Sequence, residues 1–120
     1  MSKSLLIISR QAPWAGPSAR EALDIVLAGG AFDLPIGLLF MDDGVLQLLP
    51  EQKAAHVQQK DLTANLQALS LFGIDDLYVC GESLVERGIA ASGLNIDTLQ
   101  LLNGSDISLI IDRYDQVITL

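Results

Sequence analysis

The sequence predicts an α/β fold in which helices pack against a mostly parallel sheet of about five strands. Two apolar runs, residues 4–8 and 36–41, show no regular alternation with polar residues, which is typical of strands buried on both faces. Helical patterns separate these runs from each other and from the later ones. This alternation favours parallel strands that are joined by right-handed helical crossovers.

The first βαβ unit is expected over residues 4–41. Ser18 and Glu21 match the S-x-x-E capping box that opens a helix, and the glycine pair 29–30 is expected to end it. The second strand, residues 36–41, stops at an Asp-Asp-Gly sequence, residues 42–44, which is a turn signature.

Apolar periodicity and closing glycines predict the remaining elements. In chain order they are a helical turn at 45–49, a long helix at 53–72, a strand at 77–80, a short helix at 83–87 and a strand at 97–102. Near the C-terminus, residues 107–111 fit a strand, yet Ser105 could also cap a helix that reaches Arg113. Residues 117–120 make the better last strand.

The composition predicts one domain, residues 1–120, with an apolar surface. Of its 120 residues, 50% are hydrophobic and only 18% are charged, and the mean hydropathy is +0.40. A domain of this size leaves about a third of its chain surface in contact with water, so it should need more polar cover than this. We therefore expect a partner to cover some of the apolar surface.

Charge and cysteine content exclude several classes of function. The formal net charge of −8, without any cluster of lysine and arginine, repels phosphate backbones and argues against direct nucleic-acid binding. No apolar segment approaches the roughly 20 residues that span a bilayer. The single cysteine fits a reducing, cytoplasmic location and leaves a thiolate zinc site without a second sulfur.

That cysteine, Cys80, is the main candidate for chemistry. It lies where the strand 77–80 meets a helix, and a helix N-terminus at the carboxyl edge of a sheet favours an anion such as a thiolate. Inert packing competes with this reading, because free cysteine often acts as a small buried hydrophobe. Glu82 also opposes a thiolate, as does the alternative that Ser83 is the N-cap. His56 lies in a different segment, so no cysteine-protease arrangement is indicated.

Two further features have both a functional and a structural interpretation. Asp42 and Asp43 at a strand end could hold Mg²⁺, as in a flavodoxin-like or receiver-like binding module, or they could be solvated turn residues. The loop that contains Trp14 has neither a dinucleotide fingerprint nor a P-loop, which weakens that binding module as an alternative. Trp14 is instead a candidate anchor for a partner.

Three stretches, residues 9–21, 41–53 and 71–88, resemble the small sulfur-relay family of DsrE, DsrF and DsrH, called TusD, TusC and TusB in tRNA thiolation. The middle stretch is the most specific, because its Asp-Gly-Val-x-Gln-Leu-Leu-Pro-x-Gln string, residues 43–52, is similar to the DsrF/TusC branch. The resemblance covers essentially the whole chain. It implies a three-layer α/β/α domain.

The resemblance also implies a function and partners. It implies a heterohexamer, a dimer of three-subunit units, formed with TusB-like and TusD-like paralogues. Persulfide sulfur would arrive from a TusA-like carrier and leave through a TusE-like carrier toward 2-thiouridine at tRNA wobble positions, or would serve sulfur oxidation. Neither a metal nor an organic cofactor is implied.

The family's sulfur-carrying cysteine belongs to the DsrE/TusD subunit, and Cys80 occupies the matching place here, eight residues before Gly88. Subunits of the DsrF/TusC branch are generally partners rather than carriers, so the resemblance implies an accessory, assembling subunit with Cys80 as a candidate sulfur acceptor. The motif residues Asp43, Gly44, Gln47 and Pro50 are expected, with Trp14, to shape an intersubunit surface.

Overall fold

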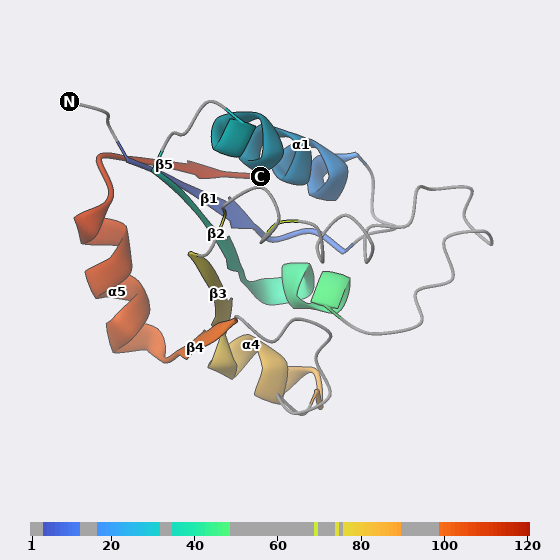
Figure 1. The fold of residues 1–120 in the computed structure, drawn as a ribbon. Coiled ribbons are helices and arrows are strands. Elements are labelled where there is room, and N and C mark those ends of the chain that lie inside the picture. Colours follow the sequence, from blue (N-terminus) through green and yellow to red (C-terminus); the bar gives the residue numbers. More distant parts are fainter. Residues whose placement is uncertain are drawn as a thin grey trace.

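The computed structural model describes residues 4–12, 17–31, 35–48, 69, 74, 76–89 and 99–120. Within these ranges five parallel strands form one sheet in the order β4-β3-β2-β1-β5 (Figure 1). The strands are β1 (Leu5–Ser9), β2 (Ile36–Phe40), β3 (Leu77–Cys80), β4 (Gln100–Leu102) and β5 (Gln116–Thr119). The helices are α1 (Ser18–Ala31), the 3-10 helix η1 (Asp42–Leu48), α4 (Gly81–Glu86) and α5 (Gly104–Arg113). The predicted α/β fold with a parallel sheet is confirmed.

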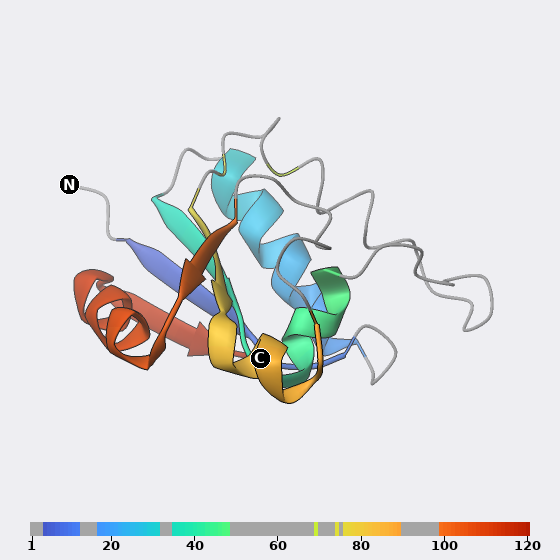
Figure 2. The same cartoon turned by 90° about the horizontal axis from the view of Figure 1, so that it is seen from below.

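The order of the strands places the two ends of the chain on neighbouring strands. From β1 the sheet grows through β2 and β3 to β4, and the chain then returns along α5 to β5, which pairs with the other side of β1 (Figure 2). All strand pairs are parallel, with Leu5 opposite both Ile36 and Gln116. As a result, the carboxyl ends of the strands all lie at one edge of the sheet, where η1 and α4 begin.

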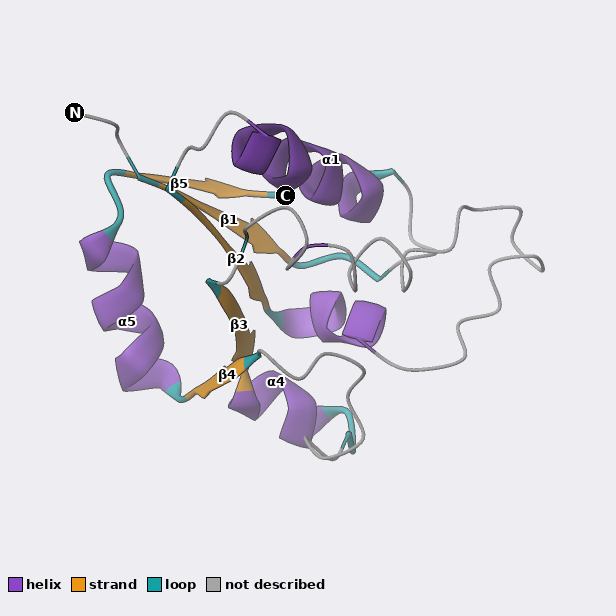
Figure 3. Cartoon of the chain, viewed as in Figure 1, coloured by secondary structure: helices purple, strands orange, loops and turns teal. Residues whose placement is uncertain are grey.

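Alternate residues of the central strands feed two separate cores. On one face, Ile7 and Leu38 pack with Leu23 and Val26 of α1. On the opposite face, the neighbouring strand residues pack against α5, whose contribution is Ile107 and Ile110 (Figure 3). The helices therefore cover both faces of the sheet, which accounts for the fully buried β2.

The predicted end of the first helix is wrong. The helix α1 continues through the glycine pair to Ala31. The reason is packing rather than capping, because Gly29 is buried and a Cβ at that position would come within 2.8 Å of Ile36 Cδ1. Glycine here lets the helix approach β2 closely.

The ambiguous C-terminal segment is a helix, so the strand at 107–111 is wrong. The capping residue is Asn103 rather than Ser105: its side-chain oxygen accepts from the Asp106 N–H at 2.9 Å, and Asp106 accepts from the Asn103 N–H in return. This reciprocal capping box fixes the start of α5. The last strand, β5, follows as expected but begins one residue earlier, at Gln116.

The remaining boundaries differ modestly or cannot be compared. The strand expected at 97–102 is present from Gln100, and Leu99 precedes it as irregular chain. The long helix expected at 53–72 lies outside the described residues except for Leu69, which is fully buried. No helix in the described part of the chain is long and apolar enough to cross a membrane.

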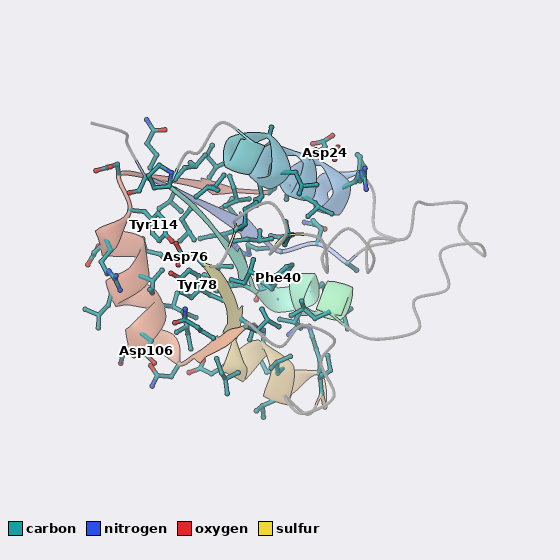
Figure 4. All side chains as sticks on the ribbon, in the orientation of Figure 1. Asp24, Phe40, Asp76, Tyr78, Asp106 and Tyr114 are labelled. Atoms are coloured by element: carbon teal, nitrogen blue, oxygen red, sulfur yellow. The ribbon has the colours of Figure 1, made fainter. Side chains whose placement is uncertain are left out.

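Tyr114 should make the chain less stable at alkaline pH. Its side chain, at the end of α5, faces Tyr78 of β3, and the two hydroxyl oxygens are 3.3 Å apart (Figure 4). Burial, then the Tyr78 hydrogen bond, raises the pKa of Tyr114 well above its ordinary value, with Asp76 adding to the rise and Arg113 opposing it. Above a pH of about 10, Tyr114 loses its proton in the unfolded chain but keeps it in the folded one, so the free energy of unfolding falls as the pH rises. Urea unfolding at a series of pH values should show a smaller decline for Tyr114→Phe. An identical decline in both proteins would contradict this assignment.

Candidate functional site

Cys80 ends β3 and is also the N-cap of α4, so the chain passes from strand to helix without a loop. Its backbone is extended, with φ −77° and ψ 114°, and its side chain makes no capping hydrogen bond. The short helix expected at 83–87 is present but runs from Gly81 to Glu86, and the alternative that Ser83 is its N-cap is wrong. Ser83 is buried, and its hydroxyl has a different partner, described below.

The Cys80 side chain lies in the core that α5 covers. It is only 5% exposed and belongs to the cluster that contains Tyr78, Leu39, Leu102 and Ile107. Leu102 of β4 is its direct neighbour in the strand register. The cysteine is free, and in this conformation it packs as a small apolar side chain.

The Asp-Asp-Gly sequence after β2 forms the first turn of η1 and packs closely against the end of β1. Asp42 has a positive φ of 51°, and the Gly44 N–H donates to the Met41 carbonyl at 2.8 Å. Gly44 is buried, and a Cβ at this position would overlap the carbonyl oxygen of Ser9. The glycine is thus required by a backbone contact between two segments.

Polar contacts tie η1 to α4. The Asp42 N–H donates to Ser83 Oγ at 2.9 Å, which explains why Ser83 is not the cap of its own helix. Asp43 Oδ1 lies 3.0 Å from Arg87 Nη2 and 3.1 Å from Arg87 Nε, and Arg87 Nη1 donates to the Ser83 carbonyl at 3.2 Å. Arg10 Nε donates to Asp42 Oδ2 at 2.6 Å. Together these bonds brace the helix that Cys80 caps.

The ion pairs of Asp42 and Asp43 argue against the interpretation of these residues as magnesium ligands. Each of Asp42 and Asp43 has an arginine partner, Arg10 and Arg87 respectively. Among the described residues, no group of three or more histidine, cysteine, aspartate or glutamate side chains is placed to hold a metal. The two carboxylates therefore act as structural ion-pair partners in this structure.

The candidate residues from the sequence fall into two groups. Cys80, Asp43 and Gly44 lie at the carboxyl edge of the sheet, and the backbone of Gln47 lies in η1. Trp14, Pro50 and His56 lie outside the described residues. Sequence reasoning missed three residues of the bracing network: Arg10, Ser83 and Arg87. No local sequence pattern pairs these residues with the aspartates, although Arg10 and Arg87 are two of only seven lysines and arginines in the chain.

Breaking the Asp43 pair should have a moderate effect. We expect Asp43→Asn to lower the free energy of unfolding by about 1 kcal/mol, because Arg87 is only 23% exposed and also contacts the Ser83 carbonyl. Asp24→Asn, which breaks the Arg20 pair, is the matched control and should cost less than about 0.5 kcal/mol, because that pair joins residues four apart within α1 and connects no two elements. Urea unfolding measures both. Equal losses would contradict a bracing role for Asp43.

The fold and the site define a class: a parallel α/β domain whose buried cysteine joins the end of a strand to the start of a helix. The chain belongs to the DsrE/DsrF-like family, whose model matches residues 3–120. It is 64% identical to "Protein TusC homolog" of Pseudomonas aeruginosa over 120 residues, which is 100% of both chains. It is 33% identical to "Protein TusC" of Buchnera aphidicola over 116 residues, 97% of this chain and 98% of that one. The resemblance to the TusC branch is confirmed.

Two solved structures share the fold over their full lengths and over this full chain. The crystal structure of the ychN protein from E. coli has a TM-score of 0.81 at 22% sequence identity. A protein of unknown function from Methanobacterium thermoautotrophicum has a TM-score of 0.65 at 13% identity. These similarities concern the fold alone.

Proposed function

We propose that this chain is a TusC-type subunit of a sulfur-relay complex that passes persulfide sulfur toward 2-thiolation of the tRNA wobble uridine. The observation that carries the proposal is the full-length identity of 64% to a TusC homologue, within a chain that belongs to the DsrE/DsrF-like family. This function places the chain in the cytoplasm. The flavodoxin-like or receiver-like alternative is not favoured, because Asp42 and Asp43 are engaged by arginines.

The main contribution of the chain is assembly. Large apolar side chains are exposed on five elements of the described fold: Ile25 on α1, Val85 on α4, Leu101 on β4, Leu109 on α5, and Val117 and Ile118 on β5. Full burial of an exposed side chain of this kind is favourable by roughly 1.5–3 kcal/mol, and by proportionately less where part of it is already buried. The partners in this proposal are TusB-like and TusD-like paralogues in a heterohexamer built from two heterotrimers, with TusA-like and TusE-like carriers on either side of the transfer.

Co-expression tests the assembly role. The chain should self-associate when it is purified alone, and it should purify as one defined complex with the TusB-like and TusD-like chains of the same genome. Light scattering during size-exclusion chromatography gives the mass and hence the stoichiometry. A monodisperse monomer that ignores both paralogues at high concentration would overturn the proposal.

A second role, sulfur acceptance at Cys80, has one structural argument in its favour: the residue caps α4 at the carboxyl edge of the sheet. In this role the Cys80 thiolate attacks the outer sulfur of a donor persulfide. A bond forms between Cys80 Sγ and that sulfur, the donor's S–S bond breaks, and the donor leaves as a thiolate. The next acceptor thiol repeats the exchange on the Cys80 persulfide.

Labelled sulfur separates the two roles. The assembled complex is loaded with labelled persulfide sulfur, and mass spectrometry locates the label in the native and Cys80→Ser complexes. The assembly role alone predicts no label on Cys80 and undiminished transfer in the variant. Label on Cys80 together with a loss of transfer in Cys80→Ser would establish the acceptor role.

A further inference from the structure

An open groove of about 610 Å³ lies between α4, the end of β4 and the start of α5. Two strongly exposed aliphatic side chains, Val85 (79%) and Leu101 (56%), line it. The groove adjoins the thiol-bearing junction, since Gly81 follows Cys80 and Leu102 is the strand neighbour of Cys80. In Figure 1, α4 and β4 lie at the lower edge of the molecule, and α5 begins beside β4 and runs up the left side.

The rim of the groove is acidic. Glu82, Glu86 and Asp106 line it, and none of the described lining residues is lysine or arginine. Glu86 is 70% exposed and has only a loose ion pair, with 3.8 Å between its Oε2 and Arg87 Nη1. Glu82 reaches across toward α5, because a Cβ at Gly104 would lie 3.6 Å from Glu82 Oε1. Exposed aliphatic side chains among several carboxylates are complementary to an aliphatic side chain flanked by cations.

We propose that this groove binds a segment of a protein partner that inserts one aliphatic side chain between Val85 and Leu101. Lysine or arginine residues beside that side chain pair with Glu82 and Glu86. The inference rests on the proposed function for the existence of a protein partner, and it adds the surface and the chemistry of the contact. Because the groove borders the Cys80 junction, such a partner would dock next to the cysteine without displacing the core that covers it.

The test is an NMR titration of the full chain with an octapeptide that carries one leucine between lysines in a glycine–serine background. We expect the shifted amides to be confined to α4 and to residues 100–106. Val85→Ser should weaken binding about tenfold, because the aliphatic contact is lost. Glu82→Gln/Glu86→Gln should weaken it further and reduce its dependence on salt.

Matched variants and peptides keep the test specific. Leu109→Ser removes an aliphatic side chain of similar exposure from α5, outside the groove, and should leave binding unchanged. A peptide with serine in place of leucine, or glutamate in place of lysine, should not bind. The proposal is overturned by shifts spread over other faces, by equal binding of the control peptides, or by the absence of binding. Self-association of the chain alone is measured first by dilution, and the proposal is also overturned if the peptide adds no shift at these amides beyond those that dilution reverses, which would make a second copy the occupant. The co-expression result with the paralogues does not depend on any of these outcomes.

Discussion

Replacing Gly44 with alanine lowers the free energy of unfolding by about 3 kcal/mol, the upper end of the usual cost of overpacking. The added methyl group would overlap the Ser9 carbonyl oxygen, and that oxygen already accepts a hydrogen bond from the Met41 N–H at 3.1 Å. The added Cβ is fixed by the backbone at residue 44, and the Ser9 carbonyl is itself backbone, so neither can rotate away as a longer side chain would. Relief requires η1 and the end of β1 to separate. Urea unfolding followed by circular dichroism measures the loss, and a variant that fails to fold satisfies the prediction as well.

Gly104→Ala is the control for this prediction. Gly104 is the first residue of α5, and an added methyl would meet only Glu82 Oε1, at an ordinary contact distance of 3.6 Å. Alanine is the better helix former, so the variant should be neutral or more stable by about 0.5 kcal/mol. If the two substitutions have equal effects, the steric explanation of Gly44 is wrong.

The Gly44 contact changes the interpretation of the most specific sequence motif. In this structure Asp43 and Gly44 hold η1 against α4 and β1 within a single chain. That is sufficient reason for the Asp-Gly pair to stand at this position. The intersubunit role expected for Asp43, Gly44, Gln47, Pro50 and Trp14 stays a prediction.

The fold could be predicted because its strands are encoded locally. Continuous apolar runs mark β1 and β2 directly, and Leu77–Cys80 is predicted with its exact bounds. Two of the errors share one cause, which is tertiary contact. Gly29 is a residue type that often ends a helix, yet here it lies within α1 and allows close packing against Ile36. Ser83 has the chemistry of an N-cap, yet its hydroxyl is taken by Asp42.

The candidate site was predictable in position but not in environment. The junction at Cys80 follows from a strand that meets a helix pattern, and the structure places the residue there. Its burial depends on Leu102 and Ile107, which come from a later strand and helix. The Asp43–Arg87 pair likewise joins residues 44 positions apart. A single sequence contains no local signal for contacts of this kind.

The burial of Cys80 leads to the second large effect. Iodoacetamide should alkylate Cys80 in the folded chain about a hundredfold more slowly than in the urea-unfolded chain, because the reagent must wait for local opening of the structure. Cys80 is 5% exposed and lies within the core that α5 covers. Mass spectrometry at timed intervals gives both rates. Leu102→Ala should accelerate the folded-state reaction, since Leu102 is the strand neighbour of Cys80, whereas Leu109→Ala, on the exposed side of α5, should not.

This rate decides how the two roles of the chain relate. A slow reaction in the isolated chain means that a donor persulfide meets Cys80 only after the α5 side of the core opens, so any acceptor role requires the assembled complex to change that cover. A slow reaction that persists in the complex leaves assembly as the function. Alkylation at a rate within a few-fold of that of the unfolded chain would contradict the burial of Cys80. It would then favour a role for Cys80 as a sulfur acceptor. Measuring the same rate before and after addition of the paralogues therefore connects the packing of one side chain to the choice between carrier and scaffold.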